Sequence, residues 1–212
     1  TGVVLANELL DDLPFALLHR VDGRWAEVRV AESADGGFEE ALVVAPPALA
    51  AAASRLVPDA PAGARIPLQF AAARWVGDAL RLLERGRLVV IDYAVARTAE
   101  LARRPPGDWV RTYRHGGPGT APLDRPGSQD ITCEVCIDQL ARARPPVSDR
   151  SQADFLAAHG IDALVAAARA AWRSAAAPDL AALRARSRVV EADALTDPAG
   201  LGAFRVLEWP AG

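Results

Sequence analysis

The stretch GVVLANELLDDLP at residues 2–14 decides both the fold and the place of the chemistry. Residues 3–6 form a short apolar run, which is typical of a strand buried on both faces. The run ends on an amide and a carboxylate, and two further acids follow: Asn7, Glu8, Asp11 and Asp12. In open α/β sheets, ligands bind beyond the carboxyl ends of the strands. The stretch therefore predicts a buried strand with a candidate site at its end.

A second stretch, ERGRLVVIDYA at residues 84–94, repeats this arrangement. Its apolar run ends on Asp92, and Tyr93 follows directly. A helix is predicted before it, over residues 68–84, because apolar side chains recur there at spacings of three and four. A helix that leads into a buried strand favours an α/β fold with parallel strands. We therefore expect the two strand ends to bring their carboxylates to one crevice.

The segment between the two stretches predicts an antiparallel β and helical insertion over residues 15–66. Residues 15–20 and 25–30 flank an Asp-Gly pair, which is a strong hairpin signal. Residues 37–45 are predicted to add a third strand. An alanine-rich stretch bounded by prolines predicts one short helix with loops on each side.

The second half of the chain predicts a long loop at residues 103–126 and a short strand at residues 131–137. Helices are predicted at residues 152–159, 163–174 and 179–187, and a last strand at residues 203–209. Ser151 is the expected N-cap of the first of these helices, because Asp154 lies at the third position after it.

Composition limits the classes of protein to which the chain can belong. Its 212 residues suit one domain, and a hydrophobic content of 51% is enough for a core. The formal net charge is −3, without a basic stripe that would favour nucleic acid. No apolar run approaches the ~20 residues of a membrane span. We expect a cytoplasmic protein that binds neither nucleic acid nor membranes.

The two cysteines, Cys133 and Cys136, form a CxxC pattern. A structural zinc site needs about four ligands, and the sequence has no second cysteine pair to complete one. A redox pair would open a helix after a strand, whereas this pair lies within a strand-like run. We therefore expect buried thiols and no metal site.

Several segments, taken in order, resemble the MidA-type proteins, a family of bacterial and mitochondrial S-adenosylmethionine-dependent methyltransferases. The mitochondrial member is a complex I assembly factor that methylates an arginine of a complex I subunit. Besides the two stretches above, the resemblance rests on RWAEVRV at 24–30, PGSQDITCEV at 126–135 and SQADFLAAHGI at 151–161. It spans most of the chain, and the combination is specific although each segment alone is a weak signal.

The resemblance implies a class I methyltransferase fold, a Rossmann-like sheet of seven mostly parallel strands with helices on both faces. It also implies S-adenosylmethionine as the cofactor, held by a glycine-rich loop after the first strand. No segment here matches that loop, and the chain has no methionine and begins inside a strand-like run. We therefore expect residues 1–212 to be the later part of one methyltransferase domain, starting at its fourth strand.

The strand ends and the resemblance together nominate the residues of the site. An arginine substrate is a planar cation, which carboxylates bind through paired hydrogen bonds. The residues nominated as catalytic are Glu8, Asp11, Tyr93 and Asp130. Those nominated to contact the cofactor are Asn7 and Glu8. Those nominated to contact the substrate are Asp92, Gln129, Thr132 and His115.

Several of these residues also have a purely structural explanation. Asp11 could simply favour the dipole of a following helical turn, and Asp92 could cap a loop. Asp130 and Thr132 could hold an Asx-type turn. His115 lies among loop charges of a kind that are usually solvated.

Two positions depart from the family pattern. Gln69 stands where the family often has a glutamate, and Ala94 stands where many members have a glycine, which has more freedom at positive φ. These departures leave open an assembly or interaction protein that keeps the fold without catalysis. A methyltransferase for small molecules is a third possibility.

A protein substrate is the expected partner of the leading interpretation. Apolar sheet edges left without neighbouring strands would also favour self-association, so a homo-oligomer is possible.

Overall fold

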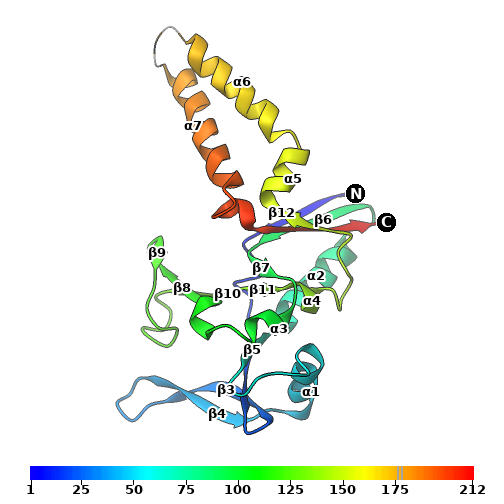
Figure 1. The fold of residues 1–212 in the computed structure, drawn as a ribbon, viewed down its shortest axis with the longest axis vertical. Coiled ribbons are helices and arrows are strands. Elements are labelled where there is room, and N and C mark those ends of the chain that lie inside the picture. Colours follow the sequence, from blue (N-terminus) through cyan, green and yellow to red (C-terminus); the bar gives the residue numbers. More distant parts are fainter. Residues whose placement is uncertain (176, 178) are drawn as a thin grey trace.

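The computed structural model describes residues 1–175, 177 and 179–212, and a mixed four-stranded sheet lies at its centre (Figure 1). The strands, in spatial order, are β1 (Gly2–Asn7), β6 (Gly86–Asp92), β13 (Arg205–Ala211) and β12 (Ser148–Ser151). β1 and β6 are parallel, whereas β13 is antiparallel to both of its neighbours. Three strands therefore share one direction and β13 alone runs against them.

β1 and β6 begin and end at the same level. Their register runs from Gly2 opposite Gly86 to Asn7 opposite Ile91. Gly86 has a φ of 138°, and a Cβ added there would lie 1.8 Å from the carbonyl oxygen of Gly2. Only glycine allows the two backbones to approach so closely at this point. The residues that follow the two strands consequently meet beyond the carboxyl ends of these strands, at the other end of the sheet from Gly86.

Helix α2 (Phe70–Leu82) covers one face of this sheet. Its apolar stripe packs on the strands, as the spacing of three and four predicts, and Val76 and Ala79 meet Leu88, Val90 and Trp209 in one core cluster. The prediction of a helix at residues 68–84 is confirmed with shorter ends. Residues 65–68 are strand instead, because they pair with the hairpin strand β2.

The segment from residue 16 to residue 68 forms a separate antiparallel sheet in the order β4-β3-β2-β5. Its strands are β2 (Ala16–Val21), β3 (Arg24–Glu32), β4 (Phe38–Val44) and β5 (Arg65–Leu68). The Asp-Gly turn forms the predicted hairpin, with Asp22 at φ 47° and Gly23 at φ 73°. Helix α1 (Pro47–Leu56) packs against this sheet, and the buried Trp25 donates to Ser54 Oγ at 3.2 Å.

The predicted long loop at residues 103–126 is only partly a loop. It contains the 3-10 turn η1 (Pro106–Asp108) and the strands β8 (Val110–Arg114) and β9 (Gly117–Pro118). β8 pairs with β10 (Asp130–Cys133) in a small antiparallel sheet. The prediction failed because the partner of β8 lies beyond a long irregular segment, so the sequence shows no local hairpin.

The predicted strand at residues 131–137 is broken into shorter elements. β10 ends at Cys133, and β11 (Val135–Cys136) pairs in parallel with β7 (Ala94–Val95). Two one-turn helices lie nearby, α3 (Thr98–Leu101) and α4 (Ile137–Leu140). The break occurs because Glu134 N donates to Trp109 O while Val135 N donates to Tyr93 O.

A long helical hairpin extends away from the central sheet (Figure 1). It consists of α6 (Ile161–Ser174) and α7 (Leu180–Thr196), and it is joined to the sheet by α5 (Gln152–Ala158) and the 3-10 turn η2 (Leu201–Ala203). Ser151 Oγ accepts from Asp154 N at 3.0 Å, so the predicted N-cap is confirmed. α7 continues well past its predicted end at residue 187, because no glycine or proline interrupts it before Pro198.

Within the described residues, no helix is long and apolar enough to cross a membrane. Across the same part of the chain, no group of three or more His, Cys, Asp or Glu side chains is arranged to hold a metal ion.

Candidate functional site

Asp92, the last residue of β6, links the ends of the two parallel strands. Its Oδ2 accepts from Leu10 N at 3.1 Å and from Asp11 N at 3.4 Å, and its Oδ1 accepts from Tyr93 N at 3.0 Å. The side chain is only 1% exposed. Because both oxygens face backbone N–H groups, the geometry suits a positioning residue better than the substrate contact expected from the sequence.

Asp11 lies beside Asp92 and has an oxygen left over. Its side chain is buried, and Oδ1 has no hydrogen-bond partner among the described residues. Burial raises the pKa of Asp11 to about 6, and the neighbouring Asp12 charge raises it further. Burial, with the Asp11 charge second, raises the pKa of Asp92 to about 8. Near neutral pH the pair therefore favours one ionised and one protonated carboxyl.

Tyr93 lies next to Asp11 and Asp92. Its hydroxyl donates to Thr132 Oγ1 on β10, and burial raises its pKa well above the usual range, so it stays protonated. The guanidinium of Arg111 lies over the ring at 5.2 Å, and the ring of Phe204 lies 5.9 Å away at a tilt. Three distant segments thus hold one phenol in place.

Strand β10 brings further predicted residues to the same place. Cys133 N donates to Asp11 O at 2.9 Å, which fixes β10 against the segment after β1. Burial raises the pKa of Asp12, and the charge of Asp130 raises it further, so these two carboxylates lie near each other. Thr132 is buried and Asp130 is exposed.

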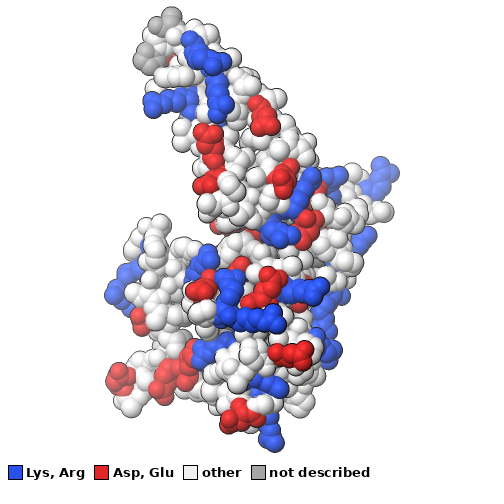
Figure 2. Space-filling view, in the orientation of Figure 1, with Lys and Arg blue, Asp and Glu red and all other residues white. Residues whose placement is uncertain are grey.

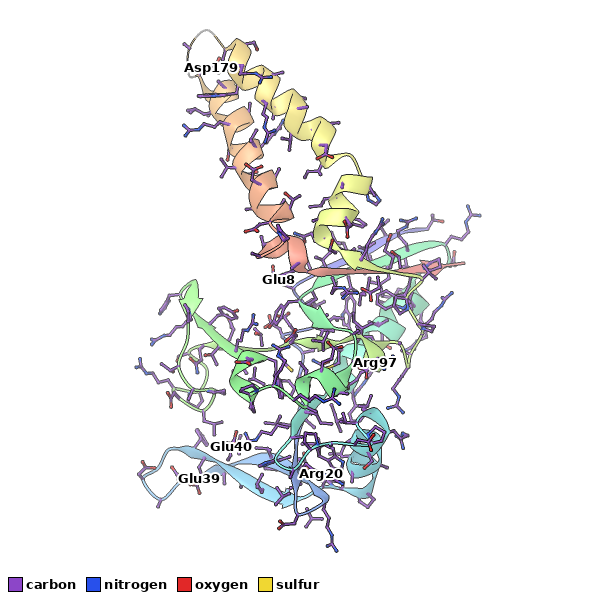
Figure 3. All side chains as sticks on the ribbon, viewed as in Figure 1. Glu8, Arg20, Glu39, Glu40, Arg97 and Asp179 are labelled. Carbon is purple, nitrogen blue, oxygen red and sulfur yellow. The ribbon has the colours of Figure 1, made fainter. Side chains whose placement is uncertain are left out.

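Asn7 is the last residue of β1, and Glu8 follows it at the same end of the strand (Figure 3 labels Glu8); both are exposed. Glu8 has a φ of 47°, and its N donates to Ile91 O at 2.9 Å, so the backbone turns as it leaves the sheet. Asn7 Nδ2 donates to Glu8 Oε1 at 3.3 Å. Both side chains are free to meet a ligand from solvent, unlike the buried Asp92.

The other two predicted substrate contacts lie in the β8–β10 region without a bond to the acidic pair. Gln129 organises its own loop, where Oε1 accepts from Thr120 N at 3.0 Å and Nε2 donates to Ala121 O at 2.8 Å. His115 lies exposed in the turn between β8 and β9 with a φ of 50°. The structure thus gives Gln129 a structural role and places His115 at a hairpin turn.

Sequence reasoning gave no role in the site to Arg111 and did not foresee the buried amide network around Gln69. Gln69 Oε1 accepts from Cys136 N at 2.8 Å, and its Nε2 donates to Glu134 O at 3.0 Å. Gln139 Oε1 in turn accepts from Gln69 N at 2.8 Å. The polar residue at the start of a helix was the available signal for Gln69. No local signal marks Arg111, because its place over the Tyr93 ring depends on how β8 packs.

The CxxC cysteines are buried and not bonded to each other, as predicted. Burial raises the pKa of both thiols well above the usual range. Cys133 Sγ lies 3.5 Å from Gln69 Nε2, so this thiol belongs to the amide network.

Comparison with known proteins gives a consistent result. Residues 1–150 match the model of the family described as "Putative S-adenosyl-L-methionine-dependent methyltransferase". Among curated proteins, none matches the chain.

Two solved structures from Burkholderia thailandensis are similar, each with 27% sequence identity and a TM-score of 0.80 over 99% of this chain. One is an uncharacterized protein, and the other is described as a "likely methyl transferase" bound to S-adenosylhomocysteine. The matches cover 55% and 53% of those chains, so this chain spans about half the length of its solved relatives.

Proposed function

Because residues 1–150 place this chain in the family described as S-adenosyl-L-methionine-dependent methyltransferases, we propose that it serves methyl transfer from S-adenosylmethionine to a protein. The proposed acceptor is an arginine side chain. The observation that carries the proposal is the meeting of Glu8, Asp11, Asp92 and Tyr93 at the carboxyl ends of two adjacent parallel strands. Ligands of open α/β sheets bind at that edge.

The acids suit a cationic acceptor in two different ways. Exposed Glu8 can accept paired hydrogen bonds from a guanidinium as it arrives. Asp11 offers a buried oxygen without a partner among the described residues, and its raised pKa matches a group that takes up a proton near neutral pH. Asp92 holds the backbone on which Asp11 stands, and Tyr93 faces the pair with a protonated hydroxyl.

The residues at the end of β1 also fit the cofactor. Asn7 and Glu8 present an amide and a carboxylate to solvent, which suit the hydroxyl and ammonium groups of S-adenosylmethionine. When bound, that cofactor supplies an activated methyl group, so the protein has to align the acceptor and manage its proton. We propose that the glycine-rich loop lies in the half of the relatives that this chain does not match.

Calorimetric titration of S-adenosylhomocysteine into the full-length protein tests the cofactor assignment. We expect measurable binding by the wild-type protein. Glu8→Gln should raise the dissociation constant, because the variant removes the charge at the end of β1. Asp59→Asn is the matched control, since Asp59 is exposed and lies between α1 and β5, away from the end of β1. No binding by the wild-type protein would contradict the assignment.

Transfer of a labelled methyl group from S-adenosylmethionine to arginine-containing peptides tests the acceptor. Incorporation that is lost with arginine-to-lysine peptides supports arginine. Incorporation into small molecules alone would favour the small-molecule alternative.

A second candidate is a protein that binds partners without catalysis. It is favoured by the outer face of the β3–β4 ribbon, where Val30, Phe38 and Val44 are 59%, 51% and 91% exposed. Apolar side chains exposed together in this way commonly mark an interaction surface. Partner binding that persists in a protein without affinity for S-adenosylhomocysteine would decide for this candidate.

A further inference from the structure

The outer part of the helical hairpin has a groove with an apolar floor and arginines around it. The groove encloses about 350 Å³ between α6 and α7. The residues that line it recur at helical spacing on each helix. We call it the arginine groove, and its residues are Arg169, Trp172 and Arg173 on α6 and Arg186, Val189 and Val190 on α7. All the charged residues of this lining are arginines.

Trp172 holds one of these arginines in place. The guanidinium of Arg186 lies over the Trp172 ring at 5.7 Å, so this contact joins α7 to α6. A guanidinium that stacks on an aromatic ring keeps the N–H donors at its edge available to other groups. Arg186 is exposed. It is therefore oriented in advance to bind a carboxylate through paired hydrogen bonds.

The positive charge of the groove is not neutralised by the residues that the structure describes. None of the ion pairs in that part of the chain includes Arg173 or Arg186. Arg169 lies 3.7 Å from Asp193, but the two side chains are 55% and 66% exposed, and such a pair is weak. The groove therefore attracts an anionic partner.

The surroundings of the groove reinforce this attraction. The outer part of the hairpin, residues 166–189, has five arginines and one acid, although the whole chain has a formal net charge of −3. Figure 2 shows basic side chains gathered over this part of the molecule. The hairpin extends away from the central sheet, so the groove is accessible to a large partner (Figure 1).

The floor of the groove calls for an apolar contact in addition to the charge. Val190 is 62% exposed, and Trp172 and Val189 are half-buried. Sites for single-stranded nucleic acid stack successive bases on several aromatic rings, whereas this floor has one ring and two aliphatic side chains. A groove between two helices is a common seat for an amphipathic helix. The lining thus favours a protein helix over a nucleic acid.

A helix from a second copy of the chain fits the charge poorly. The described helices of ten or more residues are α1, α2, α6 and α7, and each of them carries at least one arginine. Such a helix would bring further positive charge to the groove. A foreign helix with acids alone complements it better.

We propose that the arginine groove binds an acidic amphipathic helix of a partner protein. The apolar side of that helix covers Trp172 and the two valines, and its carboxylates bind the arginines. Arg169 and Arg173 are one helical turn apart, so they match carboxylates spaced by one turn on the partner. The hairpin lies outside residues 1–150 and contains neither Asp11 nor Asp92, so this proposal does not depend on methyl transfer.

Fluorescence anisotropy of a labelled peptide, titrated with the full-length protein, tests the proposal. The probe is a helical peptide of five turns, about 18 residues, with leucines along one side and glutamates along the other. We expect the wild type to bind it, and more weakly as salt is raised. The same peptide with glutamine in place of glutamate should bind about tenfold more weakly or less.

The double variant Arg173→Gln/Arg186→Gln should raise the dissociation constant of the acidic peptide about tenfold, because two charge pairs are lost. Arg184→Gln/Arg188→Gln is the matched control, since it removes the same charge from residues that line the other side of the hairpin. It should change binding less than about twofold. Circular dichroism should show equal helix content in both variants, because all four arginines are exposed.

Three results would overturn the proposal: no binding of the acidic peptide by the wild type, equal losses in the two double variants, or equal binding of the glutamine peptide. Two further results would assign the groove to another occupant. One is tighter binding of a single-stranded RNA oligonucleotide that Arg173→Gln/Arg186→Gln abolishes. The other is self-association in sedimentation velocity that the same variant abolishes.

Discussion

The surroundings of Asp11 differ from those of an ordinary surface carboxylate. It is buried beside a second carboxyl, and its Oδ1 has no partner among the described residues. Keeping such a group costs stability unless a ligand uses it. We therefore place the chemistry of the proposed site at Asp11 and the arrangement of the backbone at Asp92.

Replacing Asp11 by Asn should abolish most of the methyl transfer while leaving the fold intact. The amide keeps the size of the side chain but cannot accept a proton, and a general base of this kind contributes about 10²–10⁴-fold to rate. Rates of the full-length variant at saturating S-adenosylmethionine, beside thermal melts, measure this. Asp59→Asn, the same change at an exposed position away from the acidic pair, is the control. An unchanged rate in Asp11→Asn would remove Asp11 from the catalytic group.

The raised pKa of Asp92 determines how its contribution to the free energy of unfolding changes with pH. Its pKa is about 8 in the folded chain against 3.8 for an ordinary aspartate, so the folded chain holds a proton that the unfolded chain releases between these values. The free energy of unfolding should fall as pH rises through this window, and the contribution is complete only below it. Asp11 acts in the same direction, up to about pH 6.

Urea unfolding followed by the fluorescence of the buried Trp109 and Trp209 tests the pH dependence of stability. Asp92→Asn should flatten the decline between pH 5 and 8, because the amide does not titrate there. A decline as steep as that of the wild type would show that other groups cause it.

At the scale of elements, buried amides join the start of α2 to the strands near the site. Gln69 accepts from Cys136 N and donates to Glu134 O, and without it these two buried backbone groups lose their amide partner. Gln69→Leu should therefore lower the free energy of unfolding by about 2–4 kcal/mol, since each buried group left unpaired costs about 1–3 kcal/mol. Gln129→Leu removes a comparable set of bonds in an exposed loop, where water can replace them, and should cost less than about 1 kcal/mol.

Chemical denaturation of the two glutamine variants side by side gives this comparison. Equal losses would mean that the bonds of Gln69 are no more protected from water than those of Gln129.

The elements that follow a regular pattern were predictable from the sequence. The apolar run of β1, the run of β6, the Asp-Gly hairpin and the stripe of α2 each carry their signal locally. β12 was not predictable, because SDRS has no apolar residue and forms a strand through its pairing with β13. The β8–β10 sheet was not predictable either, since its strands are separated by an irregular segment.

The site was predictable where it depends on strand ends. Asp11, Asp92 and Tyr93 meet because β1 and β6 are parallel and level, and that rule can be applied to a sequence. The contact of Tyr93 with Thr132 and Arg111 depends on where β8 and β10 pack, which no local pattern encodes. Asp92 was nominated as a substrate contact because the sequence does not show that its oxygens bind backbone N–H groups.

At the scale of the whole molecule, β1 is an open edge of the central sheet. Within the part of the chain that the structure describes, it pairs with β6 and no other strand, and Val3 and Leu5 are 65% and 62% exposed. An apolar edge strand that has no charged residue or proline favours pairing with a strand of another chain. Leu5→Lys should therefore reduce aggregation of this 212-residue chain several-fold, as measured by light scattering on storage. Leu82→Lys, at an exposed position outside β1, is the control, and equal improvement by both would argue against the edge.

Gly86 has an influence that reaches well beyond its own turn. It lies at the end of the sheet opposite the acids, about 20 Å away by the rise of a strand. Because a side chain there collides with Gly2, even alanine must shift one strand against the other, and the shift is transmitted along both to Glu8 and Asp92. A library screened for loss of activity should therefore yield position 86 among its most intolerant sites, although it lies at the other end of the strand from the acids. Directed evolution of this protein should therefore retain glycine at position 86.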